Sequence, residues 1–160
     1  MIRSATQNDR LAIGHIYCEG WKAGYRGLIP DAFLDGLTDE SCAPPAVPSS
    51  GVLVFEAEDG LLTGVVRFGP MRVSPDGHTG EIQSIYILPD HWRMGAGKAL
   101  FEGAALQLRK EGYDSLFLWA LTGNRRAAAF YARMGMTACD CRFIEIGGKT
   151  LPETGWRMPL

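Results

Sequence analysis

The sequence has little of what membrane proteins and secreted proteins need. None of its apolar runs approaches the ~20 residues of a membrane-spanning helix. Its polar start, MIRSATQNDR, does not resemble a secretory signal peptide. From these features we expect a cytoplasmic protein with no membrane partner.

Spacings typical of metal sites are also missing. The cysteines form no C-x-x-C pair, and the histidines show no metal-binding spacing with them: Cys18, Cys42, Cys139, Cys141, His15, His78 and His91. A structural zinc ion needs about four well-placed ligands. We therefore expect structural or incidental thiols and no metal.

Neither sign of charge predominates, because the net charge of the chain is only −2. The first 71 residues are acidic, whereas residues 72–133 carry 8 basic and 6 acidic side chains. This basic excess is too small for a nucleic-acid surface but suits a small phosphorylated ligand. The 160 residues, 46% of them hydrophobic, are enough for one globular domain, residues 1–160.

The order of apolar patterns and turn signals predicts an α/β (α+β) fold. We expect a first strand, two helices and a loop at 38–51, then a hairpin turning at Asp59-Gly60 and a further turn at 74–80. The first helix starts at Asn8 or Asp9, and the second near Pro30. A strand at 81–88, a helix at 95–110, a strand at 114–121, a helix at 124–134 and two last strands follow. This order predicts a mixed sheet with helices on both faces.

The predicted turn before the helix at 95–110 is unusual, because it places Gly95 and Gly97 at the start of that helix. Glycine weakens a helix by roughly 1 kcal/mol relative to alanine. Unpaired N–H groups at a helix start bind phosphates, and glycine lets an anion approach the backbone. A turn without a ligand is the alternative.

Two familiar phosphate loops do not fit this turn. A Walker loop is excluded by Trp92 and Ala99, and a dinucleotide fingerprint by Leu100. A nucleotide-binding protein is therefore disfavoured.

Two segments together, EIQSIYILPDHWRMGAGKAL and TGNRRAAAFYARMGM, resemble the signature of the GCN5-related N-acetyltransferases (GNAT). In that family a Q/R-x-x-G-x-G/A turn holds the pyrophosphate of acetyl-CoA. The resemblance implies a mixed, mostly antiparallel sheet of about seven strands. Trp92 departs from the pattern, which has Gln or Arg at that position.

The resemblance also implies the parts of a cofactor site. The pyrophosphate would be held by the backbone of Arg93, Met94, Gly95, Ala96, Gly97 and Lys98. The backbone of Ile85, Tyr86 and Ile87 would pair with the pantetheine arm, and the Ile87 N–H would polarise the thioester carbonyl. Asn124 is a helix N-cap, a cofactor contact, or both. The arginines of 124–134 form an expected solvated face, one of them being a candidate for the 3′-phosphate.

Acetyl transfer to an amine requires one proton to leave the amine and one to reach the thiolate. Tyr131, at the edge of a predicted apolar stripe, is the candidate acid; a packed tyrosine is the alternative. Trp119 occupies one of the family's two base positions and cannot accept the proton. Glu81 occupies the other; a solvated carboxylate, with water as the base, is the alternative.

The acceptor site is less well marked. Tyr17, Trp21 and Tyr25 recur every four residues, which is typical of a core face. Trp21, Tyr25 and Arg26 are nevertheless candidates for the acceptor site, and the acidic first half favours an amine over an anion.

We therefore predict an acetyl-CoA-dependent N-acetyltransferase. Its acceptor would be a primary amine, on a small molecule or a peptide N-terminus, attacking directly in a ternary complex. The alternative is a non-catalytic acyl-CoA-binding or regulatory domain. A homodimer is possible from the family alone.

Overall fold

The computed structural model describes residues 1–73 and 77–160 of the chain. Residues 74–76 of the turn expected at 74–80 therefore lie outside the described residues. Among the described residues, no helix has both the length and the apolar character to cross a membrane.

The N-terminal elements begin with strand β1 (Ile2–Ser4) and a 3-10 turn (Gln7–Asp9), which leads into helix α1 (Arg10–Tyr25). Asp9 accepts hydrogen bonds from the backbone N–H and the hydroxyl of Thr6, at 2.7 and 3.0 Å. Arg3 reaches the same carboxylate at 2.8 Å. The chain entry to α1 is thus tied to the first strand.

Two short helices follow α1. Helix α2 (Asp31–Asp35) begins after Pro30, as predicted. Helix α3 (Asp39–Cys42) lies inside the segment predicted as a loop, so that part of the prediction was wrong. Thr38 and Ser41 cap each other reciprocally and start this helix, and Ala43 returns to extended backbone before Pro44. The single turn is too short for an apolar period to reveal.

The remaining elements build and cover the sheet. They are β2 (Val52–Glu56), β3 (Leu62–Pro70), β4 (Thr79–Ile87), α4 (Ala96–Lys110), β5 (Ser115–Leu121), α5 (Arg125–Arg133), β6 (Thr137–Ile146) and β7 (Lys149–Pro159). The strand order is β1-β2-β3-β4-β5-β7-β6. Of the pairings described, only β4 with β5 is parallel. The predicted mixed, mostly antiparallel sheet of seven strands is confirmed.

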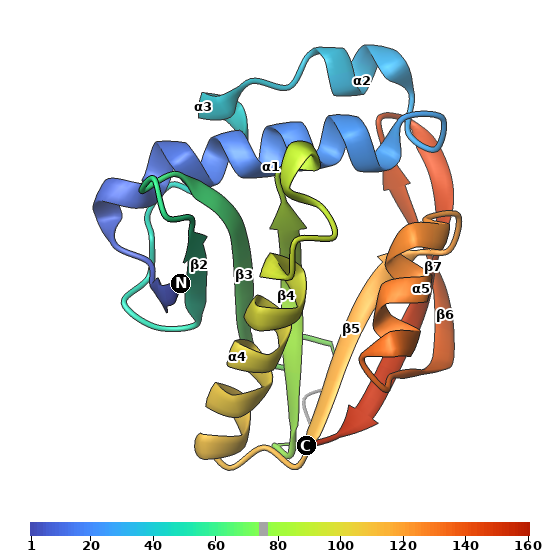
Figure 1. The fold of residues 1–160 in the computed structure, drawn as a ribbon. Helices are drawn as coiled ribbons and strands as arrows, with labels where there is room; N and C mark the ends of the chain where they lie inside the picture. The colour runs from blue at the N-terminus through green and yellow to red at the C-terminus, as the bar shows by residue number, and fades with distance from the viewer. Residues whose placement is uncertain (74–76) are drawn as a thin grey trace.

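Neighbouring residues of β3 show that both faces of the sheet are covered. Val65 packs in a cluster with Ile13 and Ile16 of α1, whereas Val66 packs with Leu100 of α4. Successive strand residues point to opposite faces, so α1 and α4 lie on opposite sides. Helix α5 joins the α4 side through Tyr131. Figure 1 shows α4 and α5 over one face and α1 crossing the other.

The central strands β4 and β5 separate soon after they meet. They pair only from Thr79–Glu81 to Ser115–Phe117, while β4 still pairs with β3 up to Ile87. In Figure 1 the two strands diverge from their lower ends. Gln83 is an extra residue opposite β3, a bulge two positions after the last β4–β5 pair. Bulges bend and twist a strand, so this one helps to turn β4 away from β5.

The hydrogen bonds of Asp9 at the start of α1 should make the free energy of unfolding depend on pH. Hydrogen bonds from Arg3, and secondly from Thr6, lower the pKa of Asp9 from 3.8 to about 2. Because the folded pKa is the lower one, this stabilisation is present above pH 3.8 and is lost as the pH falls toward 2. We expect Asp9→Asn to reduce the free energy of unfolding by about 2 kcal/mol at pH 7.

Urea unfolding at pH values from 7 to 2 measures this effect. The difference between Asp9→Asn and the unsubstituted protein should narrow as the solution is acidified. Glu40→Gln, which removes an exposed partner of Arg10, serves as the control and should have little effect. A constant difference at every pH would refute the role given to the Asp9 charge.

Candidate functional site

The gap between β4 and β5 opens into a cavity of about 690 Å³. Its walls come from α1, β4, the turn before α4, β5 and α5. Gly20 and Gly24 of α1 line one part, and Ala127 and Phe130 of α5 another, although these helices cover opposite faces of the sheet. The cavity therefore passes through the sheet where its central strands part.

Strand β4 presents unpaired backbone to this cavity. The Leu88 N–H donates to the Thr63 carbonyl of β3, which fixes the alternation along the strand. The backbone groups of Tyr86 then also face β3, and those of Ile85 and Ile87 face the gap. The Ile87 carbonyl accepts a bond from the Trp92 indole N–H at 2.9 Å, which leaves its N–H directed into the gap.

This alternation refines the expectation for 85–87. The backbone groups of Ile85 and Ile87 face the gap, whereas the backbone of Tyr86 pairs with β3 and only its side chain is left to line the cavity. Its buried hydroxyl is hydrogen-bonded to that of Tyr25 at 2.9 Å. A side chain at Gly20 would come within 2.9 Å of the Tyr86 ring, so this glycine lets α1 pack on it.

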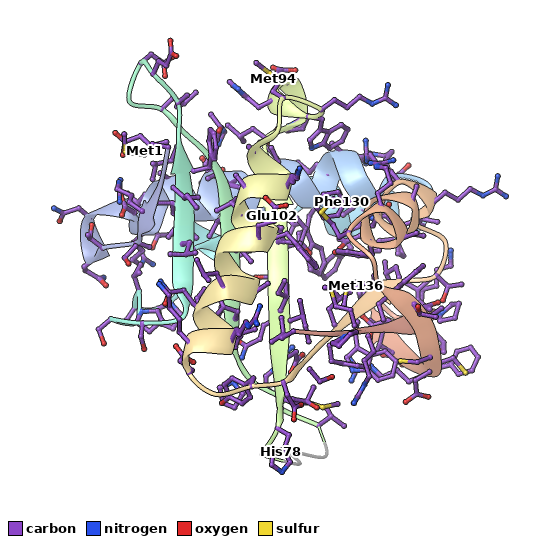
Figure 2. All side chains as sticks on the ribbon, turned by 60° about the horizontal axis from the view of Figure 1, so that its bottom comes forward. Met1, His78, Met94, Glu102, Phe130 and Met136 are labelled. Atoms are coloured by element: carbon purple, nitrogen blue, oxygen red, sulfur yellow. The ribbon has the colours of Figure 1, made fainter. Side chains whose placement is uncertain are left out.

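The turn before α4 exposes the start of that helix to the cavity. Gly95 has φ of 91° and Arg93 has φ of 64°, both in the left-handed region. The Ala99 N–H is the first to bond back, to the Gly95 carbonyl at 3.0 Å. The N–H groups of 96–98 consequently have no helical partner. Figure 2 shows Met94 at the tip of this turn and Phe130 of α5 beside α4.

The described lining of the cavity includes basic side chains but no Asp or Glu. The basic side chains there are Arg93, Lys98, Arg126 and Arg133. Of these, Lys98 lies 3.7 Å from Glu102, an exposed neighbour one helical turn away. A positive lining next to free helix N–H groups favours an anionic ligand.

Arg126 and Trp92, which both line the cavity, are in direct contact. The sequence did not reveal this contact. The guanidinium carbon of Arg126 lies 3.4 Å from the centre of the Trp92 ring. Burial, and secondly the charge of Arg93, lower the pKa of Arg126. Trp92 stands where the family pattern has Gln or Arg. Its indole N–H is hydrogen-bonded to the Ile87 carbonyl of β4, and its ring packs against Arg126 of α5. The side chain therefore links the turn before α4 to both β4 and α5.

Tyr131 is the most buried side chain of α5, with 7% of its surface exposed, rather than a residue at the edge of a stripe. Burial raises the pKa of Tyr131 above its ordinary value of 10.0, so the phenol is protonated at neutral pH. Among the described residues its hydroxyl forms no hydrogen bond, and no enclosed side-chain oxygen or nitrogen there lacks a partner. The hydroxyl is therefore reached through the cavity that Tyr131 lines.

Glu81 does not lie where a base is needed. It is 2% exposed and does not line the cavity. Arg72 holds its carboxylate through its backbone N–H at 2.8 Å and its guanidinium at 2.6 Å. Trp119, at the other base position, lines the cavity under the guanidinium of Arg142.

Asn124 is confirmed as an N-cap, because its side-chain oxygen accepts the Ala127 N–H at 3.1 Å. It also lines the cavity, so its amide group faces the same space as Tyr131.

The acceptor candidates divide among three places. Tyr25 lines the large cavity, and Trp21 lines a second cavity of about 470 Å³ between α1, α3 and the sheet. Arg26 lines neither, because its guanidinium is held at the surface by Asp31 and Asp35 at 3.1 and 2.9 Å. Its role in the acceptor site stays a prediction, to which these two ion pairs lend no support.

Comparison with known proteins agrees with this geometry. Residues 13–136 match the family model described as Acetyltransferase (GNAT) family. The chain belongs to the GNAT acetyltransferases. It is 31% identical over 160 residues to YuaI of Bacillus subtilis (strain 168), an uncharacterised N-acetyltransferase. That match covers 99% of this chain and 92% of the relative.

Solved structures extend the similarity of fold to the whole chain. The PaiA N-acetyltransferase of Thermoplasma acidophilum, in complex with coenzyme A, aligns with a TM-score of 0.79 at 19% identity, over 100% of this chain and 98% of that one. The ribosomal-protein-alanine N-acetyltransferase of Brucella melitensis gives 0.75 at 22% identity, over 100% and 99%. Within the described residues, no group of three or more His, Cys, Asp or Glu side chains is placed to hold a metal ion.

Several lining residues were missed by the sequence reasoning, among them Gln83, Ser84, His91 and Trp92. The motif itself pointed to Trp92, but only as a departure. The others carry no local signal, because a strand bulge and a contact between distant segments place them.

The two motif glycines should respond differently to substitution. Gly95→Ala forces a left-handed conformation, so we expect a loss of about 1 kcal/mol in unfolding free energy. A Cβ at Gly97 would meet Ile87 and Phe130 at an ordinary 3.7 Å. Gly97→Ala should therefore be neutral or stabilising by up to about 1 kcal/mol. Urea unfolding measures both, and equal losses in the two variants would contradict the assigned backbone.

Proposed function

We propose that this chain is one acetyltransferase domain, residues 1–160, that moves an acetyl group from acetyl-CoA to a primary amine by direct attack in a ternary complex. The observation that carries the proposal is the parting of β4 and β5 beside the free start of α4. A strand edge, unpaired N–H groups and cations then face one cavity. The cytoplasm is its proposed location, in agreement with four free thiols.

The parts of the cavity fit the parts of the donor in order. The N–H groups of 96–98, with Arg93 and Lys98 beside them, suit a pyrophosphate. The backbone of Ile85 and Ile87 suits the amide-bearing pantetheine arm, which would add to β4 as a strand adds to a sheet edge. Arg126 and Arg133 are candidates for the 3′-phosphate.

The proposed acetyl transfer takes place where the cavity is lined by Ile87 and Tyr131. Acetyl-CoA supplies a thioester, whose carbonyl carbon accepts the amine nitrogen while its C–S bond breaks. The Ile87 N–H is aimed to donate to the carbonyl oxygen as negative charge develops on it. Tyr131 donates its proton to the leaving sulfur and regains one from solvent. The amine gives up its own proton.

Water is the proposed carrier of the proton from the amine. Glu81 supports this chemistry only from a distance, because Arg72 and the strand bury its carboxylate. We infer that Glu81 keeps Arg72 and the lower part of β4 in position.

The alternative of a non-catalytic acyl-CoA-binding domain is disfavoured by one observation. Tyr131 presents a protonated hydroxyl, without a hydrogen-bond partner among the described residues, to the cavity in which a departing thiolate would form. A homodimer stays a prediction.

Tyr131→Phe tests the catalytic part of the proposal. We expect kcat to fall about 100-fold or more, since proton donation to a leaving group contributes on that scale, with little change in KM for acetyl-CoA. Tyr113→Phe, a tyrosine outside the cavity lining, is the matched control. Release of CoA thiol, followed with a thiol reagent in the presence of a panel of amines, measures both variants.

Three results would count against the proposal. If Tyr131→Phe works at the original rate, the phenol is not the acid. If calorimetry shows CoA binding but no amine stimulates thiol release, the non-catalytic alternative gains the support that the enzyme loses. If ATP or NAD binds and CoA does not, the donor assignment itself fails.

A further inference from the structure

The second cavity shares part of its wall with the first at strand β4. Gln83, Ser84 and Tyr86 line both of them. The second cavity lies between α1, the α3 segment and the sheet, on the face opposite to α4. A molecule in it would reach the end of the large cavity from the other side of the sheet.

Charge in the second cavity is of one sign. Arg67 and Arg72 are its only charged lining residues among those described, and no carboxylate lines it. Arg72 is already engaged by Glu81, with its Nη2 2.6 Å from a carboxylate oxygen. Within residues 1–73 and 77–160, Arg67 forms no ion pair. The cavity therefore has one guanidinium that no described carboxylate neutralises.

Glu153 does not compensate for Arg67. Glu153 acts electrostatically on Arg72 and on Tyr25, but its carboxylate is held by Arg142 at 2.7 Å. Glu153 is also absent from the lining of both cavities.

Arg67 is aimed at the shared wall. In the sheet it stands directly between Val52 of β2 and Ser84 of β4. Directly paired residues point to the same face, so Arg67 lies beside Ser84, whose hydroxyl is hydrogen-bonded to that of Tyr17 at 2.8 Å. Burial raises the pKa of Tyr17, and the charge of Arg67 partly opposes this.

The remaining walls are largely apolar and aromatic. Trp21 of α1 and Phe33 of α2 lie with their rings 6.2 Å apart, and Leu37, Val47 and Val52 complete that side. Arg67 itself is exposed to solvent. Its preference for a carboxylate therefore rests on its charge, which no described carboxylate neutralises, and on the planar fork of donors that a guanidinium presents.

We propose that the acceptor is an amine that carries a carboxylate, such as an amino acid, and that Arg67 binds this carboxylate. The inference rests on the proposed acetyl transfer and names its substrate class. Diamines and polyamines are disfavoured, because their second ammonium group would lie beside Arg67 and Arg72. Ser84 and Ile87 are three residues apart, roughly 10 Å along the strand, so the chain length between amine and carboxylate should matter.

The experiment compares acceptors that differ only in the distal group. Amino acids, and ω-amino acids of three to five carbons, are each assayed beside the corresponding amide and the diamine of equal length. Thiol release gives kcat and KM. We expect the carboxylate members to have the lowest KM, and the length series to identify the preferred spacing.

Arg67→Gln tests the residue directly. It should raise the KM of the carboxylate acceptors about 10- to 100-fold, the loss expected for a charge-assisted hydrogen bond. The KM for acetyl-CoA and the kinetics of the amide acceptors should stay unchanged. Arg67→Lys keeps the charge without the planar fork and should fall between the two. Arg109→Gln, at an exposed arginine outside both cavities, is the control.

The outcomes separate this inference from the proposed function. If amides or diamines are acetylated as well as carboxylates, or if Arg67→Gln leaves the preference intact, the inference is overturned while acetyl transfer stands. If no amine stimulates thiol release, the same acceptors are titrated into the CoA-loaded protein by calorimetry. Carboxylate binding that depends on Arg67 then supports the inference, and its absence overturns it.

Discussion

The parting of β4 and β5 is the constraint on which the rest of the site depends. A sheet normally pairs both edges of each inner strand, and an unpaired backbone group that is buried destabilises the fold. Here β4 and β5 pair over three residues only and then diverge. The free edge stays accessible because a cavity of about 690 Å³ opens beside it. The fold thus keeps a sheet edge in its centre that a ligand can complete.

The surroundings of this gap are arranged by charge as well as by shape. The described lining of the large cavity carries arginines and a lysine but no carboxylate. Glu81, a carboxylate near the start of β4, is neutralised by Arg72. Because no described carboxylate lines the large cavity, the positive charge at the start of α4 is not neutralised there. The second cavity also has basic side chains and no carboxylate in its described lining. This charge distribution is the basis for the proposed phosphorylated donor in the large cavity and for the proposed carboxylate-bearing amine in the second.

Local signals in the sequence predicted a large part of this. The hairpin at Asp59-Gly60, the helix after Pro30 and the capping role of Asn124 depend on a few neighbouring residues, and the structure has all three. The roles of Arg26 and Glu81 could not be read in the same way. Whether a side chain meets a cavity or an oppositely charged neighbour depends on Asp31, Asp35 and Arg72, which the motif does not include. The acidic first half of the chain gave no information on the second cavity, since none of its carboxylates is among the described lining residues.

By itself the sequence determined the order of the elements, the glycine turn at the start of α4 and the family, because these follow from apolar period, turn chemistry and short motifs. Only the tertiary structure decided which backbone groups of β4 face the gap, that Tyr131 is buried yet open to the cavity, and that Arg126 meets Trp92. It also decided that Arg67 stands without a carboxylate partner among the described residues. These features arise where segments far apart in the chain come together, and the bulge at Gln83 shifts the register in a way that no local pattern records.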